Sequence, residues 1–283
     1  MKIGFIGAGK AGCSLGKYFS LKTLPNFTLT GFYSKTSEHA IWAAHFTQSQ
    51  YFTSLADLVS ESDTIVIATQ DSVVDFVWKT IPKETLKGKI ICHLSGSLSS
   101  DVFSERESYG AYGISIHPLF AFSNKESVYQ QLHLACFTLE GDSYAVALWQ
   151  KVFADIGNPT LLLRKECKTT YHAATSMLSN HVLSVLDCGY RLLQSCGFSD
   201  AQARQFTADL VTGNLKHAIA SGTTQALTGP IERGDVNTVR SHLSCLDSQT
   251  RQIYQSCGQV LITLAKQKHP DRDYAQLKQL LTE

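Results

Sequence analysis

The chain has 283 residues, of which 43% are hydrophobic and 17% charged, and its formal net charge is +1. At roughly 100 to 200 residues per domain this length predicts two domains or one large one, and the composition is typical of a globular protein. Lysine and arginine occur only singly or in dispersed pairs such as Arg164-Lys165, which argues against a nucleic-acid partner.

Eight cysteines are scattered along the chain without a CxxC motif, so neither a zinc site nor a thioredoxin-like site is expected. The apolar run Ile3–Ile6 lacks the length and the flanks of a signal peptide. No apolar stretch approaches the roughly 18 residues of a membrane span. These features predict a reduced, cytoplasmic protein with no membrane partner.

The first half of the chain alternates strand-like and helical segments. Strands are expected at Lys2–Ile6, Thr28–Tyr33, Thr64–Ala68, Lys89–His93, Tyr112–His117 and Leu132–Leu139. Helical patterns between them include Ala11–Leu21, Ser37–Phe46 and Asp71–Ile81. This alternation predicts an α/β fold with a doubly wound, mostly parallel sheet.

After about Leu163 the chain shows helical patterns without a convincing strand. They cover Lys168–Gln194, Ser199–Ser221, Val236–Leu246 and Ser248–Lys268. We therefore predict a dinucleotide-binding domain over residues 1–162 and an all-helical domain for substrate binding and dimerisation over residues 163–283. The long helices carry more apolar residues than one small domain buries, which predicts a homodimer.

A glycine-rich motif of the form GxGxxG lies between the first strand and the first helix. It consists of Gly7, Ala8, Gly9, Lys10, Ala11 and Gly12. The first glycine permits a tight turn, the second lets a pyrophosphate approach the backbone, and the third lets the helix pack closely on the strand. In this position the motif predicts dinucleotide binding by a Rossmann-type domain.

The end of the second strand indicates which dinucleotide is bound. An NAD site normally carries an acidic residue there for the ribose hydroxyls. This chain instead has Ser34 and Lys35, which suit a 2′-phosphate, so NADPH is predicted to be preferred over NADH. The alternative is a solvated lysine in an ordinary turn.

Polar residues follow the next two strands at their carboxyl ends, where ligands of doubly wound sheets bind. Thr69 and Gln70 are expected beside the cofactor, and Asp71 to cap the following helix. Ser95 and Ser97 flank a glycine, and their hydroxyls could reach cofactor or substrate. The alternative is that this turn caps the segment that begins at Leu98.

His117 ends the strand Tyr112–His117 and precedes Pro118. A histidine at this edge could exchange a proton with a substrate at physiological pH, so we predict that His117 is the acid/base group. The alternative is a histidine that only bonds the loop backbone.

In the helical half, polar residues recur every four positions, at Lys168, His172, Ser176 and Asn180. Such a stripe lies along one helix face and predicts ligand contacts in an interdomain cleft for His172 and Asn180. Lys168, near the helix start, is expected to be solvated.

A loop between two later helices carries Arg233 and Asp235. Arg233 could pair with a substrate carboxylate in two-point fashion. Asp235 is placed in the substrate site by the same loop, and is also expected to cap the next helix.

Several of these segments together resemble one family. They are the Gly7–Gly12 loop, the segments 93–97 and 115–119, Tyr171-His172-Ala173-Ala174 with Asn180, and the stretch from Thr228 to His242. The chain resembles the predicted oxidoreductases with a Rossmann-like domain and a C-terminal helical domain of unknown function. Some members are regarded as alternative-type ketopantoate reductases. The resemblance therefore implies NADPH-dependent reduction of a small 2-oxo acid.

More distant resemblances bear on the mechanism. The chain is similar to β-hydroxyacid dehydrogenases, but their interdomain lysine would fall at Ser176 if Asn180 is their asparagine. His117-Pro118 resembles the His-Pro of prephenate dehydrogenases, which implies an acid/base role for His117, with His172 as the alternative.

We therefore predict an NADP-dependent oxidoreductase that transfers a hydride between nicotinamide and a small 2-oxo or hydroxy acid. Ser95 and Ser97 would orient the substrate, Asn180 would hold its oxygen and Arg233 its carboxylate. Two alternatives remain open. One is an NADP(H)-binding regulatory or redox-sensing module without turnover, and the other is an imine or deazaflavin-linked reductase.

Overall fold

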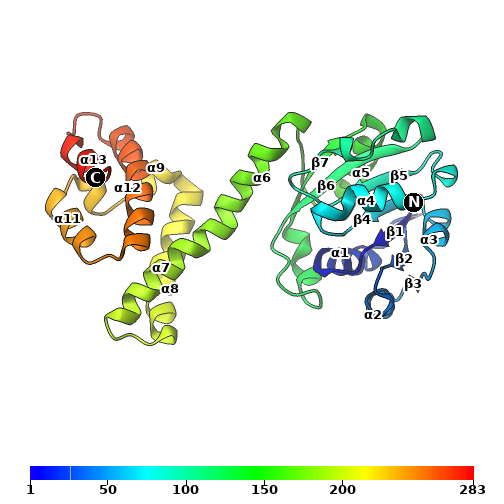
Figure 1. Ribbon diagram of the computed structural model, residues 1–283, viewed down its shortest axis with the longest axis horizontal. Helices are drawn as coiled ribbons and strands as arrows, with labels where there is room; N and C mark the ends of the chain where they lie inside the picture. The colour runs from blue at the N-terminus through cyan, green and yellow to red at the C-terminus, as the bar shows by residue number, and fades with distance from the viewer. Residues whose placement is uncertain (26) are drawn as a thin grey trace. The chain divides into compact units, whose positions relative to one another are not determined.

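The computed structural model describes residues 1–25 and 27–283 (Figure 1). The chain forms two compact units, Met1–Ser176 and Met177–Glu283. The first unit thus continues beyond residue 162, where the sequence suggests a boundary, through helix α6 (Lys168–Ser176). Within the described residues, no helix is long and apolar enough to cross a membrane.

The first unit is built on one eight-stranded sheet of order β3-β2-β1-β4-β5-β6-β7-β8. Its strands are β1 (Lys2–Ile6), β2 (Thr28–Tyr33), β3 (Gln50–Tyr51), β4 (Thr64–Ile67), β5 (Ile90–His93), β6 (Tyr112–Leu119), β7 (Cys136–Gly141) and β8 (Thr160–Leu162). All neighbours are parallel except β6 and β7. The order reverses between β1 and β4, at the type of switch point where doubly wound sheets bind ligands. The predicted fold class is confirmed.

Helices cover both faces of this sheet, as its nearly uninterrupted apolar strands require. They are α1 (Lys10–Ser20), α2 (Ser37–Thr47), α3 (Leu55–Glu61), α4 (Asp71–Thr80) and α5 (Ser143–Ile156). Residues of α1, α2 and α5 share one core with Ile3 and Phe5 of β1. Residues of α3 and α4 share the other with Ile6, because successive side chains of a strand point to opposite faces.

The face that α3 and α4 cover becomes polar over β6 and β7. Ser115 of β6 pairs with Glu140 of β7, and His117 pairs with Thr138. The residues between them on each strand are apolar and belong to the opposite core. The alternation therefore places two hydroxyls, an imidazole and a carboxylate side by side on one face, near the carboxyl end of β6.

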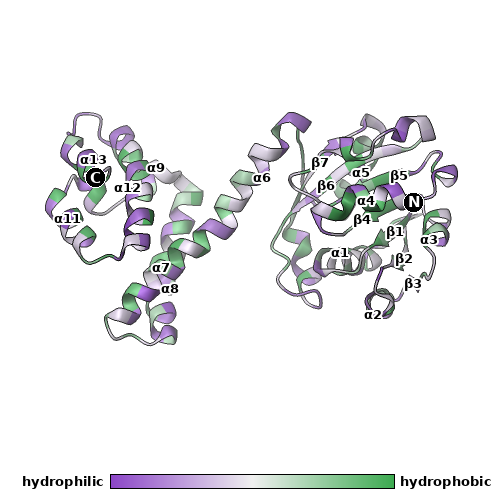
Figure 2. Cartoon of the chain, viewed as in Figure 1, coloured by the Kyte–Doolittle hydropathy of each residue, from purple (hydrophilic) through white to green (hydrophobic). Residues whose placement is uncertain are grey.

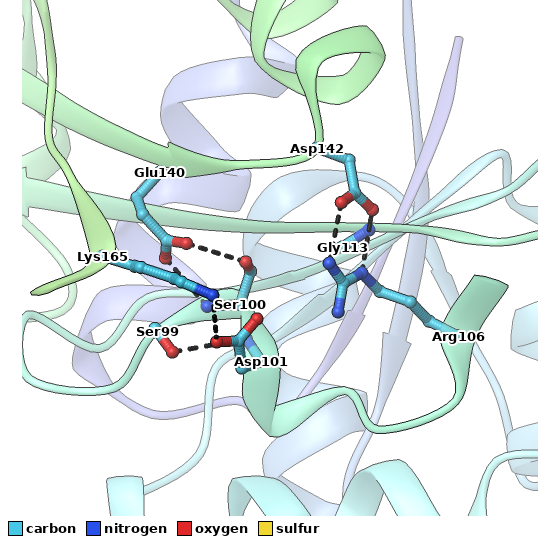
Figure 3. A network of polar contacts seen from close by, with 8 residues as sticks. All are labelled: Ser99, Ser100, Asp101, Arg106, Gly113, Glu140, Asp142 and Lys165. Carbon is cyan, nitrogen blue, oxygen red and sulfur yellow. Dashed lines mark hydrogen bonds and ion pairs between the residues drawn. The ribbon is translucent and has the colours of Figure 1, made fainter.

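Charged hydrogen bonds fix the base of this strand pair (Figure 3). The Asp142 carboxylate accepts bonds from Arg106 Nε at 2.8 Å, Arg106 Nη2 at 2.7 Å and Gly113 N at 2.7 Å. The buried Glu140 carboxylate accepts bonds from the backbone nitrogen and the hydroxyl of Ser100, both at 2.8 Å. The Asp142–Gly113 bond thus ties the start of β6 to the end of β7, and the Glu140–Ser100 bonds tie β7 to the segment that follows β5.

The second unit consists of helices only. A π-helical turn (Met177–His181) leads into α7 (Val182–Ser195), followed by α8 (Asp200–Ser221), α9 (Thr223–Ala226), α10 (Pro230–Arg233), α11 (Val236–Ser244), α12 (Ser248–Lys268) and α13 (Ala275–Leu280). A small core joins α10 to α13 and includes Ile231, Val239, Ile262 and Leu277. Ser199 and Gln202 form a capping box that starts α8.

The structure differs from the sequence-based assignment in several elements. The expected strand Leu132–Leu139 is in part a 3-10 helix, Val128–Leu134, and β7 begins only at Cys136. The helix expected over Lys168–Gln194 is interrupted by the π-helical turn. Strands β3 and β8 are too short to show a periodic pattern, and the helices α3 and α5 add to the helical segments named from the sequence.

Candidate functional site

The glycine-rich loop has the backbone geometry of a phosphate cradle. Gly7 has φ +100°, and a Cβ there would lie 2.9 Å from the carbonyl oxygen of Ala68. A Cβ on Gly12 would lie 2.7 Å from the carbonyl oxygen of Gly7. A Cβ on Gly9, in contrast, would meet no atom within 4 Å. Gly7 and Gly12 are thus required by the fold, whereas Gly9 leaves open space beside the loop.

This open space lies at the start of α1, where backbone amides lack helical partners. Gly9 is the N-cap and provides no side-chain cap. Ala8 is buried and Lys10 exposed. The loop therefore fits the pyrophosphate of a dinucleotide, held by the amides and the helix dipole of α1. The loop thus has the free backbone amides and the open space that the pyrophosphate of NADP requires.

Ser34 and Lys35 directly follow β2, which lies beside β1 in the sheet. Ser34 is half-buried and Lys35 is exposed. The adjoining positions carry no carboxylate until Glu38. A hydroxyl and an ammonium group at this strand end suit a 2′-phosphate, in line with the predicted preference for NADPH.

We expect Lys35→Ala to weaken NADPH binding about tenfold and to leave NADH binding unchanged, because only NADPH carries the phosphate that pairs with the ammonium group. Fluorescence titration of both cofactors measures the effect. Lys151→Ala, an exposed lysine on α5, is the matched control. NADH bound as tightly as NADPH by the unaltered protein would refute the preference itself.

The carboxyl ends of β4 and β5 are linked through Asp71. Its Oδ2 accepts hydrogen bonds from the hydroxyls of Ser95 at 2.6 Å and Ser97 at 2.9 Å. The N-cap of α4 is Gln70, not Asp71, so the expected capping role of Asp71 is wrong. Two serine hydroxyls draw the carboxylate towards the β5 loop instead. Thr69, the residue before Gln70, is half-buried.

Ser95 has its hydrogen-bonding capacity committed to the loop. Besides donating to Asp71, its hydroxyl oxygen accepts bonds from the backbone nitrogens of Ser97 at 3.1 Å and Leu98 at 3.0 Å. Ser95 therefore shapes the turn, as its capping alternative predicts. Ser97 is less buried than Ser95, so its hydroxyl is the more accessible of the two to a ligand.

His117 lies at the centre of the polar face of β6 and β7. Its Nδ1 is 2.7 Å from the hydroxyl of Tyr171, on helix α6. The ring of His172 meets it edge to face, with ring centroids 6.0 Å apart. A Cβ on Gly96 would lie 2.9 Å from His117 Nε2 and 2.6 Å from His172 Cδ2. Gly96 thus makes room for both histidines beside the serine turn.

Burial lowers the pKa of His117 to about 4, the electrostatic effects of Lys168 and His172 act in the same direction, and Asp71 opposes them. At neutral pH the imidazole is therefore uncharged. It can act as a hydrogen-bond donor or as a base, but not as a standing imidazolium acid.

Lys168 is buried, with 2% of its surface exposed, so its expected solvated position is wrong. Its Nζ donates to the backbone oxygen of Ser95 at 3.0 Å and to Ser115 Oγ at 2.6 Å. Burial lowers its pKa to about 8, against the opposing effect of Glu140 and Asp71. The ammonium group is thus largely charged at neutral pH and lies beneath the site.

His93, at the end of β5, is fully buried and holds the adjacent loop. Its Nδ1 accepts a hydrogen bond from Ser95 N, so its Nε2 carries the hydrogen that is directed to the Ser99 carbonyl oxygen, both at 3.2 Å. Burial lowers the pKa of His93 to about 4. His93 is therefore a neutral structural group.

We expect the free energy of unfolding to fall as the pH drops from about 6.5 towards 4. In this range the histidines of the unfolded chain bind protons, whereas the buried histidines of the folded protein stay neutral. For His93, whose pKa is lowered to about 4, the loss is about 3 kcal/mol. Urea unfolding at neutral and acid pH measures it. His93→Gln should flatten the pH dependence and the exposed-site control His133→Gln should not. Equal slopes in all three proteins would contradict this account.

Three of the predicted site residues belong to the second unit. Asn180 is exposed on the π-helical turn, and Arg233 is exposed at the end of α10. Asp235 is the N-cap of α11, where its carboxylate accepts bonds from the backbone nitrogen and the hydroxyl of Thr238. The capping role expected for Asp235 is confirmed.

Sequence reasoning missed Thr138 and Tyr171 and misplaced Lys168. One signal was present: polar and apolar residues alternate in Ile114–His117 and in Phe137–Glu140, which marks one polar face on each strand. That the two faces join, and that α6 covers them, follows only from the pairing of β6 with β7.

A glycine-rich cradle at the switch point of a parallel sheet, with polar groups at the adjoining strand ends, defines a dinucleotide-dependent enzyme of Rossmann type. Family comparisons agree. Residues 2–95 match the family described as NADP oxidoreductase coenzyme F420-dependent, and residues 135–260 match a domain of unknown function, DUF2520. The Rossmann-type part of the chain thus matches NADP oxidoreductases, and a segment that begins at β7 and runs into the helical unit matches DUF2520. The resemblance seen in the sequence and the NADP cofactor are confirmed.

Solved structures share the fold along nearly the whole chain. Protein TM1727 from Thermotoga maritima has 20% identity and a TM-score of 0.71, covering 94% of this chain and 99% of its own. An imine reductase from Myxococcus stipitatus in complex with NADP⁺ has 17% identity and a TM-score of 0.67, covering 99% and 100%. Plasmodium falciparum pyrroline carboxylate reductase with NADP bound has 14% identity and a TM-score of 0.64, covering 98% of both chains. A comparison with curated sequences finds no match.

Proposed function

We propose that the protein catalyses the NADPH-dependent reduction of a small 2-oxo acid, with ketopantoate as a candidate substrate, or the reverse oxidation of the hydroxy acid. Bound NADPH would supply the hydride. The neutral imidazole of His117 would donate a hydrogen bond to the carbonyl oxygen, and water would supply the proton that completes the alcohol, with His172 as the alternative donor. Ser97 would orient the substrate, and Ser95 would shape the turn that carries it.

The second unit would supply the remaining contacts. Asn180 would bond the substrate oxygen, and the exposed guanidinium of Arg233 would pair with the carboxylate. Asp235 is engaged as a helix cap, so we assign it no direct contact with the substrate.

The burial of Lys168 near the strand ends is the observation that favours a 2-oxo acid over an imine as substrate. A carbonyl oxygen gains negative charge as it is reduced, whereas a protonated imine loses positive charge. Lys168 places a positive charge beneath the strand ends and helps to keep His117 neutral. This field favours an anionic 2-oxo acid and its developing oxyanion over a cationic imine.

Imine reduction is the second candidate, because two similar structures are an imine reductase and a pyrroline carboxylate reductase. Reaction with a deazaflavin is a related possibility that the description of the N-terminal family suggests. Both would use the same cradle and the same strand ends.

Consumption of NADPH against matched panels of 2-oxo acids and cyclic imines tests the proposal. We expect turnover with at least one 2-oxo acid and little with imines. Turnover confined to imines would reverse the assignment. Binding of NADPH without turnover of either panel would favour the regulatory or redox-sensing alternative.

We also propose a homodimer formed mainly by the helical unit. Apolar side chains are exposed along its helices: Leu178 is 81%, Leu210 73% and Ile219 86% exposed. Figure 2 shows hydrophobic segments along α7 and α8. A largely apolar cavity of about 360 Å³ lies between α7, α10, α11 and α12. Surfaces of this kind favour association with a second copy.

We expect light scattering to give twice the chain mass at micromolar concentration. The double change Leu210→Glu and Ile219→Glu should produce a monomer, because two charges would have to be buried in the interface. Phe76→Glu, at an exposed apolar position on α4 of the first unit, is the control and should leave the mass unchanged. A monomeric unaltered protein would refute the dimer.

A further inference from the structure

Tyr171 lies between the two polar residues that pair across β6 and β7. Its hydroxyl accepts a hydrogen bond from Thr138 Oγ1 at 3.0 Å and is 2.7 Å from His117 Nδ1. The rings of Tyr171 and His117 meet at 89°, with centroids 5.5 Å apart. The phenol is thus held from two sides, and both contacts are made inside the first unit.

The direction of these hydrogen bonds follows from their donors. A phenol has one hydrogen to donate and also accepts. Since Thr138 donates to the phenol oxygen, the phenol hydrogen of Tyr171 is available for His117 Nδ1. A neutral imidazole that accepts at Nδ1 carries its own hydrogen at Nε2.

In this tautomer the hydrogen of His117 lies on Nε2, next to Gly96. Nε2 lies against the bare α-carbon of Gly96, since a Cβ there would be only 2.9 Å away. The hydrogen is therefore on the nitrogen that borders the serine turn, where two serines are bonded to Asp71. The opposite tautomer would leave that nitrogen as an acceptor only.

We infer that Tyr171, held by Thr138, fixes the tautomer of His117 so that Nε2 carries the hydrogen. Tyr171 is then a positioning residue for the hydrogen bond that His117 Nε2 would donate to the substrate oxygen, a role that rests on the proposed function. Its phenol need not touch the substrate, because it acts through the imidazole. Burial of His117, which favours the neutral ring, makes the choice between two tautomers the relevant one.

The test is nitrogen NMR of protein labelled with ¹⁵N-histidine, at neutral pH and without substrate. The ten histidines are distinguished by comparison with His117→Asn, which removes one set of signals. We expect His117 to show a protonated Nε2 and an unprotonated Nδ1. In Tyr171→Phe, which keeps the ring but removes the donor, we expect a mixture of both tautomers.

Activity provides a second readout. Tyr171→Phe should lower kcat about 2- to 13-fold, as loss of one neutral hydrogen bond implies, with KM and NADPH affinity near normal. Tyr112→Phe, on the same strand as His117, is the matched control and should change neither tautomer nor kcat. If Tyr171→Phe fails to fold, Thr138→Val weakens the same arrangement from the other side.

A hydrogen on Nδ1 in the unaltered protein would overturn the inference, as would an unchanged tautomer in Tyr171→Phe. These outcomes do not depend on the substrate. If the tautomer behaves as expected but no 2-oxo acid is reduced, the proposed function fails and the tautomer assignment stands.

Discussion

Replacing His117 by alanine is expected to lower kcat by about 10²- to 10³-fold, the range typical of a lost hydrogen-bond donor to a developing oxyanion. The imidazole lies at the carboxyl end of β6, against Gly96 and Tyr171, where it is buried and uncharged. Its removal takes away the proposed hydrogen bond to the substrate oxygen and leaves the glycine-rich loop intact. Steady-state kinetics with the substrate found by the panel measure the loss, and NADPH titration should give near-normal affinity.

His133→Ala is the matched control, because His133 is exposed on the 3-10 helix Val128–Leu134 of the same unit. It should keep full activity. The analogous change at His172 separates the two candidate histidines. Near-full turnover in His117→Ala combined with loss of activity in His172→Ala would assign the catalytic histidine to helix α6.

Replacing Gly9 by valine is expected to weaken NADPH binding roughly 5- to 150-fold, equivalent to an overpacking cost of about 1–3 kcal/mol in the complex. Gly9 has φ −78° and ψ −173°, which any residue adopts, and a Cβ there meets no protein atom within 4 Å. The fold thus tolerates the side chain. The open space it would fill is where the loop fits a pyrophosphate.

Gly9→Val should therefore lower the affinity for NADPH without lowering the thermal stability of the protein. Gly9→Val is expected to keep the melting temperature of the protein without cofactor, whereas Gly12→Ala should lower it, because its Cβ would lie 2.7 Å from the Gly7 carbonyl oxygen. Gly213→Ala, in α8 with no atom within 4 Å of the added Cβ, should leave NADPH affinity unchanged. Unchanged NADPH binding by Gly9→Val would contradict the assignment of the pyrophosphate site to this loop.

The sequence alone determined the features that depend on local pattern. The apolar runs at Ile3–Ile6 and Ile65–Ile67 and the glycines at positions 7, 9 and 12 follow from strand burial and from backbone space. They predicted the parallel sheet, its helical layers and the dinucleotide site. Ser34 and Lys35 could likewise be judged from charge, because their position after a strand fixes what they face.

The tertiary structure decided what depends on residues far apart in the chain. The antiparallel pairing of β6 with β7 sets Thr138 beside His117, and α6 then brings Tyr171 and Lys168 onto the same face. A helix start looks solvated in sequence because the polar groups that bond Lys168 come from β6 and from the loop after β5. Burial of a charge is specified by its distant partners, and those partners exist only once the sheet has formed.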